Sequence, residues 1–249
     1  MAFLLEICVE TLASARAARA GGADRLELCA SLAEGGLTPG PGLLRAGMAT
    51  GLPVMVMIRP RGGDFVFDED EVQLMIHDIA AARSAGAAGV VIGMLLPDGQ
   101  IDTINCRRLV AAARPMQVTF HRAFDHAADP VSALEQVISL GADWLLTSGQ
   151  AQGAEAGIPL LRQLVVQARG RIQLMAGAGI SPRNAALIRS ATGVQALHAS
   201  ARKPHPSPMS FQREGVPMGL PGLDAWQRME TDPDLVRAIR AAAVSTAPY

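Results

Sequence analysis

The chain has 249 residues, of which 49% are hydrophobic and 18% are charged, and its 22 basic and 23 acidic residues leave a net charge of −1. An apolar fraction this large supports a sizeable core and argues against an intrinsically disordered chain. The balanced charge excludes the basic surface that follows a phosphodiester backbone, so no nucleic acid partner is expected.

The cysteines and the first residues indicate the compartment. Cys8, Cys29 and Cys106 are scattered along the chain and odd in number, which suits a reducing compartment better than a disulfide framework. The segment MAFLLEICVE carries acid rather than base, unlike a signal peptide. No apolar run approaches the roughly 20 residues that span a bilayer. We therefore expect a cytoplasmic protein with no membrane partner.

Short apolar segments alternate with Ala-rich amphipathic segments along the chain. Strands are predicted near residues 4–9, 25–29, 54–59, 89–93, 117–121, 144–147, 172–176 and 194–198. Helices are predicted near residues 11–20, 40–50, 68–85, 102–113, 130–140, 158–168, 182–190 and 233–243. Asp129-Pro130 and Ser181-Pro182 each place a capping side chain before a proline at the first helical position.

Eight strand–helix units in a chain of this length predict a single α/β domain over residues 1–249, a closed (β/α)₈ TIM barrel. The alternative is an open doubly wound sheet, but its dinucleotide fingerprint is missing after the first strand. Two long loops stand out: RPRGGDFVFDED after the third strand, and a proline-rich extended loop over residues 201–230, before the C-terminal helix. Such loops are usually lids, interface segments or disordered.

Strand parity predicts where the polar side chains point, because neighbouring residues face opposite sides of a sheet. The apolar residues of each strand take the outer face, under the helices. The inner face then receives Glu6, Cys8, Glu27, Cys29, Met55, Met57, Arg59, Thr119, His121, Gln173 and Met175, and His198 ends the eighth strand as His121 ends the fifth. Arg122 points away from the interior by the same parity.

Two acids, one arginine and two histidines thus converge at one rim of the barrel, where barrel enzymes carry their sites. The candidate catalytic residues are Glu6, Glu27, Arg59, His121, Asp125 and His198. His121 or Glu27 would act as general base or acid, and Asp125 would fix the tautomer of His121. The alternative is a structural ion-pair network, although desolvating charges costs several kcal/mol per ion.

A second group of residues suggests an anion site. The segment MAGAGISPRN follows the seventh strand, and a helix predicted to begin at Pro182 would direct its positive end at that loop. The candidate anion-binding residues are Thr147, Ser148, Gly149, Gly177, Ala178, Gly179 and Ser200. The alternative is that the glycines only form a tight strand-to-helix turn.

Sulfur ligands share the inner face with the carboxylates. Thiolate and thioether are the donors that Cu(I) prefers, and Cys8 and Cys29 each lie two residues beyond a glutamate on neighbouring strands. These two cysteines are the candidate Cu(I) ligands. The alternative is ordinary packing, because Cys and Met fill barrel interiors well.

Nine motifs in order carry a resemblance to a known family. LLEICVE, GADRLELC, EGGLTP, IRPRGGDF, VTFHRAFD, LLTSGQ, IQLMAGAGI, LHAS and SPM together resemble the CutC copper homeostasis protein family over residues 4–209. The resemblance implies a TIM-like barrel, a cytoplasmic location, homo-oligomers and copper tolerance through Cu(I) binding. Many relatives have two adjacent cysteines after LLEI, whereas Val9 follows Cys8 here, which leaves Cys8 and Cys29 as the candidate pair.

Three functions remain open on the sequence. The first is Cu(I) binding in copper homeostasis. The second is a barrel enzyme, an isomerase, lyase or hydrolase, acting on a small anionic or phosphorylated metabolite held by Arg59 and the GAGI amides. The third is a non-catalytic scaffold in which the proline-rich loop, with Pro206 and Met209, makes the oligomer interface.

Overall fold

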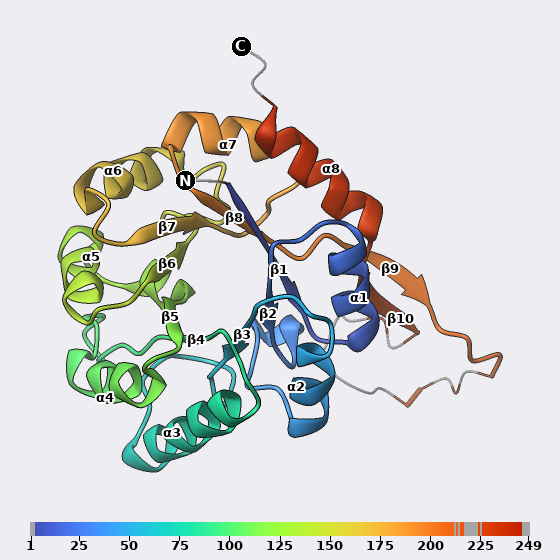
Figure 1. The fold of residues 1–249 in the computed structure, drawn as a ribbon, viewed down its shortest axis with the longest axis horizontal. Helices are drawn as coiled ribbons and strands as arrows, with labels where there is room; N and C mark the ends of the chain where they lie inside the picture. Colours follow the sequence, from blue (N-terminus) through green and yellow to red (C-terminus); the bar gives the residue numbers. More distant parts are fainter. Residues whose placement is uncertain (1–2, 212, 214, 217–223, 225, 246–249) are drawn as a thin grey trace.

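The computed structural model of the protein describes residues 3–211, 213, 215–216, 224 and 226–245. Eight parallel strands hydrogen-bond in chain order and close into a barrel, with helices around it (Figure 1). This confirms the predicted (β/α)₈ barrel. The strands are β1 (Leu4–Val9), β2 (Arg25–Leu28), β3 (Val54–Met57), β4 (Gly89–Ile92), β5 (Gln117–Phe120), β6 (Trp144–Thr147), β7 (Gln173–Ala176) and β8 (Ala196–Ala199).

A helix follows each strand, as the alternating pattern predicts. The helices are α1 (Leu12–Ala20), α2 (Pro41–Met48), α3 (Glu69–Ser84), α4 (Thr103–Ala113), α5 (Pro130–Ser139), α6 (Ile158–Ala168), α7 (Ala185–Thr192) and α8 (Pro233–Val244). Two short 3-10 helices, η1 (Leu32–Glu34) and η2 (Arg122–His126), lie in loops that follow β2 and β5. None of the described helices is both long enough and apolar enough to span a bilayer.

Capping explains one helix start that the sequence predicts correctly and one that it does not. Asp129 accepts a hydrogen bond from the Val131 amide, so α5 begins at Pro130 as expected. The prediction that the seventh helix starts at Pro182 is wrong, because α7 begins at Ala185. There the Asn184 side chain accepts a hydrogen bond from the Ser181 amide at 2.9 Å, which holds residues 181–184 in a turn before the helix.

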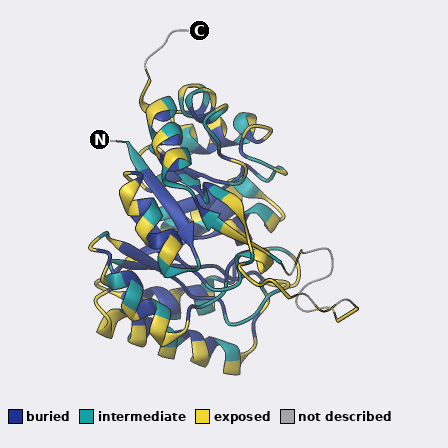
Figure 2. Cartoon of the chain, turned by 90° about the vertical axis from the view of Figure 1, so that its right-hand side faces the viewer, coloured by how far each residue is buried: buried dark blue, intermediate teal, exposed yellow. Residues whose placement is uncertain are grey.

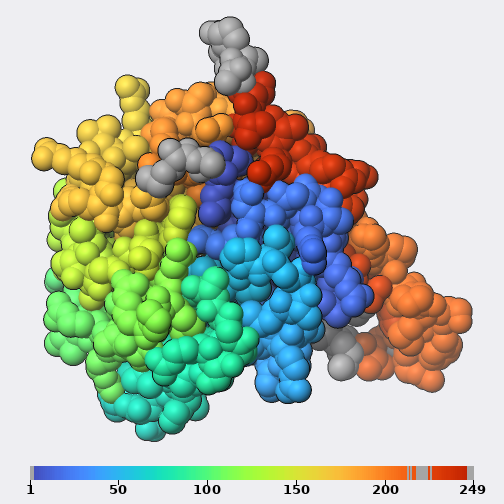
Figure 3. Space-filling model, viewed as in Figure 1, coloured from blue at the N-terminus to red at the C-terminus, as the bar shows by residue number. Residues whose placement is uncertain are grey.

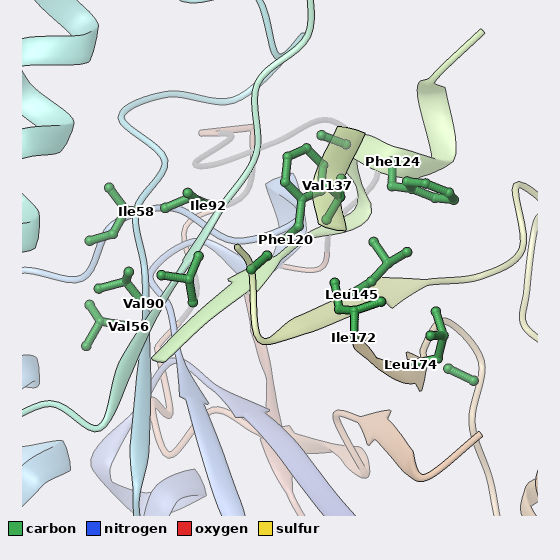
Figure 4. Close-up of a cluster of buried hydrophobic side chains, with 14 of the residues drawn as sticks. Val56, Ile58, Val90, Ile92, Phe120, Phe124, Val137, Leu145, Ile172 and Leu174 are labelled. Carbon is green, nitrogen blue, oxygen red and sulfur yellow. The ribbon is translucent and has the colours of Figure 1, made fainter. Parts of the chain in front are cut away.

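The predicted alternation of side chains is present in the core. Outward residues of the strands pack under the helices in one large apolar cluster (Figure 4), while the strands themselves are buried and the outer helix faces are exposed (Figure 2). Inside the barrel lie two smaller apolar clusters. One is built around Cys29, Met55, Met57 and Val91, and the other around Leu146, Met175 and Ala196. Charged side chains occupy the interior as well, including Glu6 and Arg25.

The proline-rich segment differs from the extended loop expected over residues 201–230. Its two ends form an antiparallel hairpin of β9 (Arg202–Pro206) and β10 (Gln227–Thr231), which projects from the side of the barrel (orange in Figure 3). The buried Ser14 hydroxyl of α1 accepts a hydrogen bond from the Thr231 amide at 3.1 Å and ties the hairpin to the barrel. Residues 212, 214, 217–223 and 225 of the predicted loop lie outside the described residues.

Candidate functional site: the mouth of the barrel

A cavity of about 530 Å³ lies over the carboxyl ends of the strands. Its wall includes side chains that end β1, β2, β3, β5 and β8, together with the loops after β3 and β7. This is the end of a TIM barrel at which ligands bind. Eight of the predicted site residues line it directly: Cys8, Glu27, Arg59, His121, Ala178, Gly179, His198 and Ser200.

Strand register determines which polar side chains meet on one side of this cavity. Glu6 of β1 lies opposite Arg25 of β2 and opposite His198 of β8, while Cys8 lies opposite Glu27. We call these five residues the carboxylate cluster. The similar sequences of β1 and β2 suggest that Glu6 lies opposite Glu27. In the barrel the two strands are shifted by two residues from that alignment, so Glu27 lies opposite Cys8.

Glu6 is the centre of the carboxylate cluster and has no exposed surface. One of its oxygens accepts a hydrogen bond from Arg25 Nε at 2.6 Å, and the other lies 2.8 Å from His198 Nδ1. The Arg25 guanidinium also lies 4.7 Å from the ring centroid of Trp144. Sequence reasoning missed Arg25, although its position two residues before Glu27 gives it the same inward parity.

Cys8, Glu27 and His198 form a group with the geometry of a metal site. One ligand atom from each lies within 4.8 Å of the other two. His198 Nε2 is 3.6 Å from Glu27 Oε2, and Glu27 Oε1 is buried with no hydrogen-bond partner among the described residues. A thiol, a carboxylate and an imidazole at this spacing can act together as ligands of one metal ion.

Cys29, the other predicted copper ligand, lies outside this group. It is fully buried among Met55, Met57 and Val91, and its thiol donates to Glu27 Oε2 at 3.4 Å. Burial, with the charge of Glu27 nearby, raises the pKa of the Cys29 thiol well above its ordinary value of 9.0. The described group that could hold a metal ion thus contains Cys8, Glu27 and His198 and not Cys29, because strand register sets Cys8 opposite Glu27.

The pKa values of the two acids in the carboxylate cluster are shifted in opposite directions. Burial alone would raise the pKa of Glu6, but Arg25 and His198 outweigh it and the pKa is lowered. Burial raises the pKa of Glu27, and the charge of Glu6 adds to the effect. For His198, burial opposes the charged form, but Glu27, Cys8 and Glu6 together outweigh that cost and raise the pKa well above 6.5.

A second polar group, which we call the arginine–histidine cluster, consists of Arg59, Phe65 and His121. Arg59 Nη1 donates to the carbonyls of Glu34 and Gly36 at 2.9 and 3.3 Å, and Nη2 donates to that of Gly63 at 2.8 Å. Its guanidinium carbon lies 4.8 Å from the ring centroid of Phe65. Its Nε is buried and has no partner within the described part of the chain.

His121 lies against the same phenylalanine, with the two ring centroids 5.2 Å apart. Its Nδ1 accepts a hydrogen bond from the Ala123 amide at 3.1 Å, and its buried Nε2 has no partner among the residues described. Burial, with the positive charge of Arg59, lowers the pKa of His121 from 6.5 to about 3. The imidazole is therefore neutral at physiological pH.

The prediction that Asp125 orients His121 is wrong. The Asp125 carboxylate accepts hydrogen bonds from the Thr147 hydroxyl, and from the Ser148 amide and hydroxyl at 3.0 and 2.9 Å. It also pairs with Arg122 Nε at 2.7 Å. Asp125 thus joins the loop after β5 to the loop after β6. The reason is that β5 ends at Phe120 and Asp125 lies in η2, where strand parity no longer sets its direction.

The hydrogen bonds around Asp125 also engage several of the groups that were predicted to donate to an anion. Thr147 and Ser148 donate to Asp125, the Gly149 amide donates to Thr147 Oγ1 at 2.9 Å, and the Gly177 amide donates to the Thr147 carbonyl at 3.0 Å. Ala178, Gly179 and Ser200 remain, and all three line the cavity. The residues Ala178 and Gly179 both have left-handed φ angles, of 77° and 74°.

Two arginines at the cavity were not predicted. Arg122 lines the cavity although strand parity placed it outward, because η2 rather than β5 sets its direction. Arg202 lines it from the start of the hairpin strand β9, which no periodic signal indicates.

Comparison with known proteins agrees with this architecture. The model of the CutC family matches residues 3–203. A CutC family protein of Chromobacterium violaceum is 49% identical over 96% of this chain and 97% of its own. The human copper homeostasis protein cutC homolog is 45% identical over 97% of this chain and 89% of its own.

Solved structures extend the comparison to the fold. The crystal structure of CutC from Streptococcus agalactiae has a TM-score of 0.75 and 33% identity, and covers 80% of this chain and 98% of that one. A dihydrodipicolinate synthetase of Pseudomonas aeruginosa, at 14% identity and a TM-score of 0.58 over 81% of this chain and 71% of its own, shares the barrel fold alone. The family model and the relatives together show that this chain belongs to the CutC family.

Proposed function

We propose that this protein takes part in copper homeostasis by binding Cu(I) at Cys8, Glu27 and His198. The observation that carries the proposal is the approach of three ligand atoms, from three different strand ends, to within 4.8 Å of one another. The printed names of the human and mouse relatives, which call them copper homeostasis proteins, support the choice of metal.

The residues present suit a metal ion. Cys8 is 8% exposed and lines the cavity, so an ion can reach it. Glu27 Oε1 is a buried acceptor that lacks a partner among the described residues, and a bound cation would satisfy it. Thiolate and imidazole are both good ligands for copper. Cys8, Glu27 and His198 would hold the ion, and Glu6, which contacts His198 Nδ1, would orient the imidazole.

Anaerobic competition titration with a Cu(I) chelator tests this proposal. We expect about one Cu(I) per chain and a loss of affinity of at least about tenfold in Cys8→Ser and His198→Gln. Cys106→Ser is the matched control, since Cys106 is buried in α4. Unchanged affinity in Cys8→Ser would refute the proposal. Zn²⁺ is titrated in parallel, because it accepts the same ligand types; binding of Zn²⁺ without Cu(I) would contradict the choice of copper.

A cytoplasmic location and a homo-oligomeric state belong to the same proposal. The cysteines Cys8, Cys29 and Cys106 are free and buried, as in proteins of reducing compartments. Met209 and Phe211 expose apolar side chains beyond the hairpin strand β9, where a second chain would cover them. Size-exclusion chromatography of a variant with a shortened 207–226 segment should show a smaller species, and an unaltered size would count against this interface.

A second candidate function is that of a barrel enzyme acting on a small anionic metabolite. It is favoured by the charge of the cavity wall, where three arginines, Arg59, Arg122 and Arg202, outnumber two acids, Glu27 and Glu34. A thermal-shift screen of metabolite anions should find ligands that stabilise the wild type. If no anion raises its melting temperature, this candidate function fails.

A further inference from the structure

We infer that the arginine–histidine cluster is a carboxylate-binding subsite, in which His121 serves as a neutral Nε2–H donor beside the Arg59 guanidinium. The inference goes beyond copper binding, and it rests on the second candidate function in requiring that a small anion enters the cavity. It names the ligand class and two residues that recognise it.

A hydrogen bond from the backbone amide of Ala123 determines the tautomer of His121. An amide N–H can only donate, so His121 Nδ1, which accepts from the Ala123 amide at 3.1 Å, carries a lone pair. In the neutral ring the proton then sits on Nε2. This atom is buried without a partner among the described residues, and the residue is only 4% exposed while lining the cavity. A buried donor of this kind is satisfied when a ligand oxygen accepts from it.

Arg59 presents a second donor that lacks a partner. Three backbone carbonyls hold its terminal nitrogens, and the face of Phe65 lies against its guanidinium, so its orientation is set by the protein. The residue is 5% exposed, and its Nε also has no partner in the part of the chain that is described. The cation is thus fixed by neutral groups, and among the described residues it forms no ion pair.

The backbone makes room for the imidazole at this place. Gly93 follows β4 directly, and a Cβ there would lie 2.4 Å from His121 Nδ1, closer than a Cβ atom can approach without a shift of the ring. Phe65 contacts both His121 and Arg59 and closes the subsite on one side with an apolar face. The ring of Phe65 lines the cavity beside both polar groups and offers neither of them a hydrogen-bonding oxygen or nitrogen.

The number and kind of free donors favour a carboxylate. One arginine N–H and one neutral imidazole N–H match two acceptor oxygens with a single negative charge, and hydrogen bonds to a charged acceptor are the strong ones. A phosphate group, with at least three terminal oxygens and up to two charges, would leave an acceptor unsatisfied here. His121 cannot then be the general base or acid expected from the sequence, because the neutral ring holds its proton on the nitrogen that faces the ligand.

The test is NMR of protein whose histidine side chains carry ¹⁵N, prepared without added metal and titrated with pyruvate. Pyruvamide, the neutral isostere, and inorganic phosphate are the comparison ligands. We expect the free protein to show His121 as the Nε2–H tautomer, and pyruvate to shift the His121 Nε2–H resonance while pyruvamide does not. His121→Phe and Arg59→Met should each weaken pyruvate binding by about tenfold or more, the effect of losing a hydrogen bond to a charged group.

His121→Gln is the rescue variant, because its amide can replace the Nε2–H donor, and it should bind pyruvate more tightly than His121→Phe. His77→Phe is the control, since His77 is exposed on α3. Retained Cu(I) affinity in His121→Phe would separate the subsite from the copper proposal. An Nδ1–H tautomer, or equal pyruvate affinity in His121→Phe and the wild type, would overturn the inference. Binding of phosphate alone would overturn it too, while leaving the second candidate function standing.

Discussion

Two polar clusters share the barrel mouth, and they differ in how far the protein satisfies them. In the carboxylate cluster, Glu6 is paired with Arg25 and His198 at 2.6 and 2.8 Å. In the arginine–histidine cluster, Arg59 Nε and His121 Nε2 are buried donors without partners among the described residues. The ion pairs of Glu6 are therefore complete within the protein, whereas Glu27 Oε1 of the same cluster and both donors of the second cluster lack a partner among the described residues.

Buried charges that stabilise the fold differ physically from buried groups that await a ligand. Removing one partner of a buried ion pair is strongly destabilising, because the other charge is then left in the interior without a partner. A buried donor without a partner has already lost its hydration, so the folded protein gains little from it. Stability measurements should therefore respond mainly to the ion pairs of Glu6, and measurements of carboxylate binding mainly to the arginine–histidine cluster.

The largest expected effect follows removal of Arg25. Arg25→Met leaves the Glu6 carboxylate buried with His198 as its remaining contact, and should lower the free energy of unfolding by about 3–5 kcal/mol. Urea unfolding measures it. Arg171→Met is the control, because its pair with Glu135 is about half exposed and should change stability by about 1 kcal/mol at most. A loss from Arg25→Met no larger than that of the control would remove the distinction between the clusters.

A smaller effect appears on acidification. The pKa of His121 is about 3 in the folded protein and 6.5 ordinarily, so below pH 6.5 the unfolded chain binds a proton that the folded chain does not. Stability then rises with pH across this window and falls as the pH drops. The contribution of His121 between about pH 6.5 and about pH 4.5 is about 2 kcal/mol.

His121→Gln removes this contribution but keeps the carboxylates of the wild type. Comparing urea unfolding of the two proteins at both pH values isolates the histidine, since the lowered pKa of Glu6 acts in each of them. The wild type should lose about 2 kcal/mol more than the variant on acidification. Equal losses would show that His121 is charged in the folded state, and the arginine–histidine cluster would need a different description.

The smallest expected effect concerns Gly93. A Cβ there would lie 2.4 Å from His121 Nδ1, so Gly93→Ala should displace the imidazole and cost about 1 kcal/mol of stability. Gly42→Ala is the control, because its Cβ meets no atom within 4 Å in α2 and should instead stabilise the helix by about 0.5–1 kcal/mol. Thermal unfolding measures the stability of both variants. A gain in stability from Gly93→Ala would contradict the close packing of residue 93 against the His121 ring.

Much of the fold could be predicted because it depends on local patterns. The alternation of apolar strands with Ala-rich helices predicts all eight strand–helix units. The two-residue period of side chains along a strand predicts that Glu6, Cys8, Glu27 and His121 face inward. Parity fails where a strand ends early. Arg122 and Asp125 lie in η2, just past β5, so Arg122 reaches the cavity and Asp125 bonds to the next loop.

The sequence by itself determined which side chains enter the barrel, since the direction of a side chain depends only on its place in its own strand. Tertiary structure decided which of them meet. Closing the barrel staggers the strands, so that Cys8 lies opposite Glu27 rather than Cys29, and Glu6 opposite both Arg25 and His198. His198 joins β1 only because β8, 192 residues away in the chain, completes the ring.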